Sequence, residues 1–372
     1  MNDELLKYKI GITLIKGIGS NLAKNLIAYL GSVEAVFHEK QQNLAKIPGI
    51  GEILSKEIVN QNVLKRADLE IEFITKNNIK TFYYVDREYP FRLKECADSP
   101  ILIYTKGNIS LNDGKFIGVV GTRNATETGK ENCRNLIAGI SSSVPDAIFV
   151  SGLAYGIDIC AHKAALDNNL PTIGVVGHGL DRIYPATHNS TAARMLNQGG
   201  LLTEYMSKTN PDRPNFVQRN RIIAGLCDAV VVMESAVRGG ALITAEVAND
   251  YNRDVFAFPG RVTDEWSAGC NALIKNNKAS LIESADDILK FMNWDKQISG
   301  FKPTVQTTLF LDLTDDEQLI VTILRQNPDG LQLNELAIQL EKPISKISSM
   351  LLEMEFKGLV KCLPGNVYRI VK

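Results

Sequence analysis

The chain of 372 residues contains no apolar run that approaches the ~18 residues needed for a membrane-spanning helix. Its six cysteines lie far apart and include no Cys-x-x-Cys pair, which predicts buried, reduced thiols rather than a metal or disulfide framework. The first residues are acidic and do not have the pattern of a secretory signal. We therefore expect a cytoplasmic protein without a membrane segment.

The chain also lacks an excess of charge of either sign. Its 41 basic and 42 acidic residues give a formal net charge of −1, so no global cationic field could attract a polyanion. Any binding of nucleic acid must come from local clusters of cations and from backbone donors. The hydrophobic content of 45% and charged content of 22% are those of an ordinary globular protein, long enough for two or three domains.

Four segments differ in pattern along the chain. Residues 1–80 are predicted to be helical, residues 81–293 alternate short β-branched runs with helical patterns, residues 294–313 form a linker, and residues 314–372 form a small separate unit. The alternation predicts an α/β domain with a Rossmann-like, doubly wound and mainly parallel sheet. The expected strands are 116–120, 147–151, 172–176, 201–204, 229–233 and 254–257, with a strand-like run at 101–104. The expected helices are 129–140, 159–168, 187–198, 219–225 and 241–251.

The first 80 residues contain two Gly-x-Gly turns, at Gly17 and Gly19 and at Gly49 and Gly51, each followed by a helical pattern. This is the helix-hairpin-helix pattern, in which backbone N–H groups at a helix start can hold a phosphate of duplex DNA. The other interpretation is a hairpin that only packs this domain or meets a protein. The 11 basic and 9 acidic residues of this segment leave the choice open.

The last 59 residues predict a winged helix. Thr314 and Glu317 form a capping box that opens a helix over 315–326, helices follow near 333–340 and 344–357, and a hairpin runs over 359–371 with a turn at 364–366. The winged-helix pattern favours DNA binding by this unit, whereas its seven basic and eight acidic residues argue against it. Protein docking is the expectation that we favour.

Three short segments of the middle domain bring together the residues of one phosphate-binding cleft. The first two, 118–123 and 150–158, run from an apolar stretch through glycines into a helical pattern, which is how a parallel sheet builds an anion site. The third, 216–225, places two arginines next to an aromatic residue. The candidate ligand contacts are Gly121, Thr122, Arg123, Ser151, Gly152, Phe216, Arg219, Asn220 and Arg221. Together they indicate a polyanion that carries bases, and single-stranded nucleic acid fits best.

Some of these side chains have alternative roles. Arg123 follows a strand-end turn and could contact phosphate or form an ion pair with Glu204. If Arg219 and Arg221 open a helix, one is expected to meet the ligand and the other to pair with an acid, with Asp228 and Glu234 as candidates. Phe216 is either a core residue or a platform for a base.

Two histidines also invite a functional interpretation. Asp158 and His162 stand four residues apart on a predicted helix, but no third ligand has suitable spacing, so we expect no metal site. We expect a structural hydrogen bond from His162 and a helix-start role for Asp158. His178, between two glycines at a strand end, either contacts ligand or fills the turn.

The middle domain resembles the DNA-processing protein A family (DprA, also called Smf) over about residues 89–282. The resemblance is carried by segments 118–123, 151–158 with Ala161-His162, 174–179 with Tyr184-Pro185, 216–226, 239–245 and 258–260. It implies a protein of natural transformation that coats and protects incoming single-stranded DNA, helps to load the RecA recombinase and acts as a homodimer. It also implies phosphate contacts from Arg123 and Arg213, and it adds Gly239, Gly240 and Thr244 to the DNA-binding set.

The chain departs from the family pattern at two places. Tyr155 stands where members usually have arginine, which removes a cation, and Gly239-Gly240-Ala241-Leu242 replaces Ser-Gly-Ser-Leu, which removes hydroxyls. Arg238 could restore part of the positive charge.

The competing hypothesis is enzymatic. Gly239 and Gly240 followed by Thr244 and Glu246 resemble the turn of Rossmann-like phosphoribohydrolases, which cleave the N-glycosidic bond of a nucleotide. The tight Pro-Gly-Gly-x-Gly-Thr-x-x-Glu spacing is absent, however, and the Gly118-x-x-Gly121 turn is not a dinucleotide fingerprint. We therefore expect a binding protein without catalytic residues or cofactor.

Overall fold

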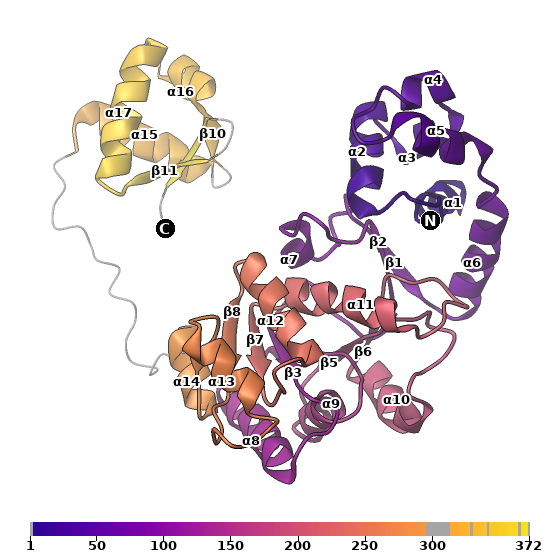
Figure 1. Cartoon of the computed structure of the whole chain (residues 1–372). Coiled ribbons are helices and arrows are strands. Elements are labelled where there is room, and N and C mark those ends of the chain that lie inside the picture. The colour runs from indigo at the N-terminus through magenta and orange to yellow at the C-terminus, as the bar shows by residue number, and fades with distance from the viewer. Residues whose placement is uncertain (1–2, 295–312, 328–329, 341, 364–365, 371–372) are drawn as a thin grey trace. The chain divides into compact units, whose positions relative to one another are not determined.

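The computed structural model describes residues 3–294, 313–327, 330–340, 342–363 and 366–370, and the chain divides into two compact units, Met1–Lys296 and Gln297–Lys372. The first unit holds both the helical N-terminal part and the α/β part (Figure 1). Nearly all of the expected linker at 294–313, and Pro364 and Gly365 of the expected hairpin turn, lie outside the described residues. The boundary expected at residue 80 stays a prediction.

Two hairpin turns organise the N-terminal helices. These helices are α1 (Asp3–Ile12), α2 (Ser20–Leu30), α3 (Val33–His38), α4 (Gln41–Leu44), α5 (Gly51–Asn60) and α6 (Leu64–Lys76). Gly17 and Gly49 have φ of +81° and +86°, which favours glycine. A Cβ on Gly17 would lie 2.7 Å from Leu54 in α5, and one on Gly49 would lie 3.0 Å from Leu22 in α2. Each turn therefore packs on the helix of the other hairpin, which confirms the tandem helix-hairpin-helix.

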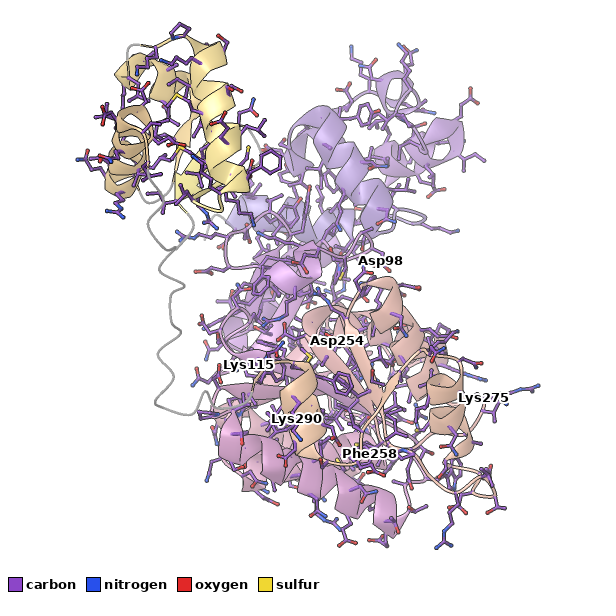
Figure 2. All side chains as sticks on the ribbon, turned by 90° about the vertical axis from the view of Figure 1, so that its left-hand side faces the viewer. Asp98, Lys115, Asp254, Phe258, Lys275 and Lys290 are labelled. Carbon is purple, nitrogen blue, oxygen red and sulfur yellow. The ribbon has the colours of Figure 1, made fainter. Side chains whose placement is uncertain are left out.

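A nine-stranded mixed sheet forms the centre of the first unit. Its order is β1 (Lys80–Tyr83), β2 (Leu102–Gly107), β6 (Gly199–Thr203), β5 (Thr172–Val175), β4 (Ala147–Ser151), β3 (Lys115–Val120), β7 (Ala229–Val232), β8 (Asp254–Ala257) and β9 (Ser280–Leu281). The pairs β1–β2 and β2–β6 are antiparallel and the remaining pairs are parallel. The expected doubly wound, mainly parallel sheet is confirmed, with β1 and β9 as unforeseen edge strands. Figure 2 labels Asp254, the first residue of β8, and Phe258, which follows its last residue.

Alternating residues of the strands fill two cores, one on each face of the sheet. Phe116 and Val230 face a core formed with α11 (Arg213–Leu226), α12 (Gly240–Asp250) and α13 (Ala268–Lys275). Ile117 and Val231 face a core formed with α8 (Glu127–Ser143), α9 (Ile157–Asp167) and α14 (Ala285–Phe291). Because side chains alternate between the faces of a strand, these runs are apolar throughout. Figure 1 shows α11 and α12 above the sheet and α8 and α9 below it. The remaining helices of this part are α7 (Phe91–Lys94), the 3₁₀ turn η1 (Ala186–His188) and α10 (Asn189–Asn197).

The direction of winding reverses between β3 and β7. From β3 the chain proceeds through β4, β5 and β6 on one side, and then returns to place β7 and β8 on the other side. The loops after β3 and β7 therefore diverge at the carboxyl ends of the strands and leave a crevice, where ligands bind in sheets of this type.

The second unit is a winged helix. Its helices are α15 (Asp315–Gln326), α16 (Leu333–Gln339) and α17 (Ile344–Phe356), and its sheet contains β10 (Leu331–Gln332), β12 (Val367–Ile370) and β11 (Val360–Leu363) in that order. Thr314 and Glu317 form the expected capping box. The pattern missed only the short strand β10, because two residues carry too little periodicity.

Candidate nucleic-acid interface

A cleft of about 640 Å³ lies at the reversal point of the sheet, between the loop after β3, the N-terminal half of α11 and the start of α12. Of the thirteen residues proposed for single-stranded DNA, ten line it: Gly121, Thr122, Arg123, Arg213, Phe216, Arg219, Asn220, Gly239, Gly240 and Thr244. Segments separated by more than 100 residues in the sequence therefore form one surface. Ser151, Gly152 and Arg221 do not line the cleft.

Helix α11 starts six residues earlier than the sequence pattern predicted, at Arg213 instead of Arg219. Pro214 stands in its first turn, where a missing N–H is tolerated. With 3.6 residues per turn, Arg213, Phe216 and Asn220 fall on one face of the helix, and all three line the cleft. Because the helix starts early, Arg213 lines the cleft although it lies outside the Arg-Asn-Arg motif.

Three arginines supply positive charge at the cleft. Arg123, Arg213 and Arg238 are exposed, and in the part of the chain that the structure describes none of them forms an ion pair with a carboxylate. The Arg123 guanidinium lies 5.8 Å from the centroid of the Phe216 ring. These guanidinium groups are free to take phosphate oxygens, which suit their forked donors.

Two aromatic rings form one wall. Phe216 is half-buried and its ring centroid lies 5.7 Å from that of Tyr184, with 31° between the planes. Tyr184 is 46% exposed. Sequence reasoning noted Tyr184 only as part of a signature, because nothing local to it shows that it reaches α11. The signal that could have found it is an aromatic residue in the loop that follows a parallel strand.

Gly239 and Gly240, at the start of α12, line another part of the cleft. Gly239 is the N-cap of α12 and Gly240 its first residue, and no atom within 4 Å would meet a Cβ on Gly240. A ligand can therefore approach the start of this helix, where free N–H groups favour an anion. Gly121 has a packing reason as well, because a Cβ there would lie 2.4 Å from Ile157.

A buried polar layer supports the cleft from below. Ser151 donates its hydroxyl to the carbonyl of Val119 at 2.6 Å, and the Gly152 N–H donates to Asp158 at 3.1 Å. Asp158 also accepts from the Ala154 N–H at 3.4 Å, so it anchors the start of α9 as expected. These contacts hold Ser151 and Gly152 in the interior, so their role as direct DNA contacts stays a prediction.

Arg219 belongs to this buried layer although it touches the cleft. It is 3% exposed and donates to the Val175 carbonyl. Burial lowers the pKa of Arg219 to about 10, opposed by the nearby charge of Asp158, so the guanidinium is protonated at neutral pH. Burial likewise raises the pKa of Asp158, opposed chiefly by Arg219. The two charges stabilise each other inside the domain.

Arg221 points to the other side of α11. It pairs with Glu204 at 2.5 Å, and both side chains are 11% exposed. The expected pairing of an arginine of this motif with Asp228 or Glu234 is therefore wrong. Asp228 pairs with Arg92 at 2.6 Å, and Glu234 accepts from the Thr126 hydroxyl at 2.5 Å. Because Arg221 occupies Glu204, the alternative ion pair between Arg123 and Glu204 is absent too.

His162 and His178 are buried and form hydrogen bonds within the domain. His162 shares a hydrogen bond of 2.7 Å with the Thr172 hydroxyl, and burial lowers its pKa to about 3. His178 donates to the Gly179 carbonyl at 2.8 Å, and burial lowers its pKa also. Within the described ranges no group of three or more His, Cys, Asp and Glu side chains could hold a metal ion.

The hydrolase-like turn does not assemble a catalytic acid in the cleft. Thr244 is buried and lines it, but Glu246 is exposed and pairs with Lys278 at 3.0 Å. Among the described residues that line the cleft, Asp158 is the single carboxylate, and it already accepts from two backbone N–H groups and lies in the field of Arg219. The described lining therefore offers donors suited to an anion, and its one carboxylate is engaged by backbone N–H groups.

The hairpin glycines form a separate surface in the N-terminal helices. Gly19 caps α2, and no atom lies within 4 Å of a Cβ placed on Gly19 or Gly51. Gly17 and Gly49 are instead packed on the facing leucines. Contact of these four glycines with duplex phosphates stays a prediction.

No helix of the described residues is long and apolar enough to cross a membrane.

Three parts of the chain match models of known protein families. Residues 80–293 match the DNA recombination-mediator protein A family, residues 308–366 match the DprA winged helix domain, and residues 11–61 match a SAM-like helix-hairpin-helix tandem. The first match alone spans more than half of the chain, and the order of the three agrees with the fold. The protein belongs to the DNA recombination-mediator protein A (DprA/Smf) family.

Individual relatives agree with this assignment. Protein Smf of Synechocystis is 31% identical over 97% of this chain and 98% of its own length. DNA processing protein DprA of Streptococcus pneumoniae is 41% identical over 60% of this chain and 77% of its own length, and its X-ray structure superposes with a TM-score of 0.62 over 78% of this chain and 97% of that one. A structure on the single-stranded DNA binding mode of DNA processing protein A from Helicobacter pylori has 25% identity and a TM-score of 0.52, covering 58% of this chain and 95% of that one.

Proposed function

We propose that this protein binds single-stranded DNA in the cleft at the reversal point of the sheet. The observation that carries the proposal is that three arginines, which form no ion pair with any described carboxylate, line one cleft together with two partly exposed aromatic rings. Arginines hold backbone phosphates, and aromatic rings stack on bases that only a single strand exposes. The Helicobacter pylori relative, described by its single-stranded DNA binding mode, supports the same ligand here.

The binding should have little sequence preference. The described lining offers guanidinium groups, backbone N–H groups and ring faces, and these position a strand without distinguishing its bases. We propose that the protein is not an enzyme, since its cleft holds no free carboxylate to move a proton.

We propose further that the protein acts in the cytoplasm in natural transformation, as a homodimer that protects incoming DNA and loads the RecA recombinase. Membership of the DNA recombination-mediator family supports this role. The winged helix, with its nearly balanced charge, is proposed to dock a protein rather than DNA.

The first experiment is fluorescence anisotropy of a labelled oligo-dT with the full chain across a range of salt, beside a hairpin duplex. Affinity that favours the single strand and falls steeply with salt is expected, because bound phosphates release counterions. Equal weak binding to both would contradict the proposal, and turnover of an AMP-like substrate would favour the hydrolase hypothesis.

The recombinase role has its own test. On an oligonucleotide already coated with a single-strand-binding protein, this chain should shorten the lag before RecA hydrolyses ATP, and light scattering should show a dimer. Tight binding of DNA with an unchanged lag would remove RecA loading from the proposal and leave the DNA-binding function in place.

A further inference from the structure

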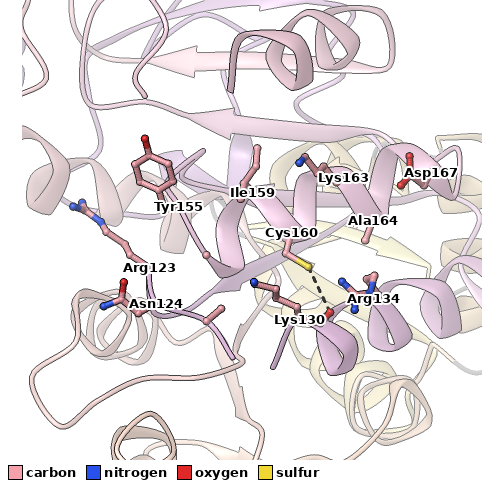
Figure 3. Close-up of a pocket in the computed structure, with 12 residues that line it drawn as sticks. Arg123, Asn124, Lys130, Arg134, Tyr155, Ile159, Cys160, Lys163, Ala164 and Asp167 are labelled. Atoms are coloured by element: carbon pink, nitrogen blue, oxygen red, sulfur yellow. Dashed lines mark hydrogen bonds between the residues drawn. The ribbon is translucent and has the colours of Figure 1, made fainter. Parts of the chain in front are cut away.

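A second cavity, of about 790 Å³, lies between helices α8 and α9 on the other face of the sheet from α11 (Figure 3). We call it the α8–α9 groove. Lys130 and Arg134 reach it from α8, and Cys160 and Lys163 from α9. None of these four residues belongs to the motifs that predicted the DNA cleft.

The groove is positively charged. Arg123, Lys130, Arg134 and Lys163 line it, against one carboxylate, Asp167. Asp167 pairs with Arg194 at 2.8 Å, and Lys130 pairs with Glu127, which is 84% exposed. Over the described residues, Arg123, Arg134 and Lys163 have no ion pair, so their charge is available to a ligand.

The charges of Arg134 and Lys130 also act on the thiol of Cys160, which lines the groove. Its pKa falls to about 7, first through a hydrogen bond with the Cys133 side chain and then through the charges of Arg134 and Lys130. Burial opposes this shift. Its Sγ also contacts the Lys130 carbonyl at 3.5 Å, as the dashed line in Figure 3 shows.

One residue joins the groove to the cleft. Arg123 lines both cavities, and on the cleft side its guanidinium lies over Phe216. Tyr155, which is 48% exposed, lines the groove from the segment just before α9 and offers an aromatic face there. A strand that leaves the cleft past Arg123 therefore meets further cations and a further ring.

We propose that the α8–α9 groove holds the next nucleotides of the strand bound in the cleft, with Arg134 and Lys163 on its phosphates. The inference rests on the proposed single-stranded DNA binding and extends it to a longer track. Tyr155, the position where the chain departs from the family's usual arginine, then contributes stacking in place of charge.

The test compares two oligo-dT lengths, of about 5 and about 20 nucleotides, which fall near the lower end and above the ~4–16-nucleotide range of single-strand sites. The variants are Arg134→Glu and Lys163→Glu, both at exposed positions. The matched control is Lys275→Glu, an exposed lysine that lines neither cavity and is labelled in Figure 2. Each groove variant should weaken the long oligonucleotide and lower its salt slope by about 0.7 for one lost phosphate contact. The short oligonucleotide should bind as before.

Other outcomes separate this inference from the proposed function. If Phe216→Ala weakens both lengths while the groove variants match Lys275→Glu, the track ends at the cleft and only the inference fails. If the groove variants weaken the binding of both oligonucleotides equally, the effect is a general change in the electrostatic field, and the inference is overturned as well. If neither set of variants matters, the proposed function fails as well. Competition by inorganic pyrophosphate that Lys163→Glu abolishes, with long-strand binding unchanged, would assign the groove to a free phosphate compound and overturn the inference.

A second readout does not depend on long-range charge. Cys160 lines the groove but is 9% exposed, so iodoacetamide should alkylate it slowly, with Cys160→Ser to identify the adduct. The long oligo-dT should slow this reaction and the short one should not. An equal rate with and without the long strand would contradict occupation of the groove.

Discussion

The two faces of helix α11 carry the same residue type in opposite roles. On the outer face, Arg213 and the neighbouring Arg123 are exposed, lie beside Phe216 and form no ion pair with any described carboxylate. Arg219 and Arg221 leave the helix in different directions, but both turn to the inner side of the domain, where they are buried and held by Val175 and Glu204. The comparison teaches that an arginine's role follows from the charges within reach and the water around it rather than from the motif that contains it.

The largest expected effect is on the inner side. Arg221→Ala leaves Glu204 buried without its partner, which should lower the free energy of unfolding by about 3–5 kcal/mol, measured by urea denaturation. The double variant Arg221→Met with Glu204→Gln should recover much of this loss. A stable Arg221→Ala protein that has lost DNA binding would erase the distinction between the two faces.

The inner layer should also make the fold sensitive to acid. His162 has a folded pKa of about 3, below the ordinary 6.5, so the unfolded chain takes up a proton that the folded one refuses. Stability is therefore complete above pH 6.5 and falls as the pH drops from there toward 3, by about 2 kcal/mol at pH 5. In urea denaturation at pH 7 and pH 5, His162→Gln should show a smaller difference than the parent. An identical difference would place the acid sensitivity elsewhere.

The outer face should respond in binding and not in stability. Phe216→Ala should weaken oligo-dT binding by about 1–3 kcal/mol through the loss of stacking on a base, measured by anisotropy. Phe216→Tyr keeps a ring and should bind nearly as the parent does. If Phe216→Ala instead unfolds the protein and leaves the affinity of the folded fraction unchanged, Phe216 is a core residue.

The smallest effect concerns one phosphate contact. Arg123→Ala should weaken binding modestly and lower the salt slope by about 0.7, whereas Arg123→Lys should keep most of the slope. The measurement is the affinity of oligo-dT across a salt series. An unchanged slope for Arg123→Ala would remove this residue from the contacts and leave Arg213 and Arg238 as the cations of the outer face.

The sequence pattern located most regular elements of the first unit because their signals are local. The bounds of β4 and β8 were predicted to the residue, since β-branched runs mark them. It missed the edge strands β1 and β9 and the helices α13 and α14. The two strands have only four and two residues, and their pairing partners, not their own periodicity, make them strands.

The residues of the candidate site also fall into two groups, those that the sequence identified and those that only the structure showed. Glycine turns and the Phe216–Arg221 segment identified a phosphate site from sequence because each is contiguous. Six of the nine contacts proposed from these segments share a cleft with Arg213, Gly239, Gly240 and Thr244. Sequence could not show that Ser151 and Gly152 turn inward, that the Tyr184 ring lies against Phe216, or that Lys163 and Arg134 line one groove. Each of these depends on which elements the sheet brings together.

By itself the sequence therefore determined a mainly parallel sheet with glycine-rich turns at its carboxyl edge, a pair of hairpins before it and a winged helix after it. Local backbone preferences and the alternation of apolar residues are enough for that. Only the tertiary structure decided which arginines are free. Burial and the distance to a carboxylate set the state of a charge, and both come from packing between segments such as α11 and the end of β6 that are distant in the chain.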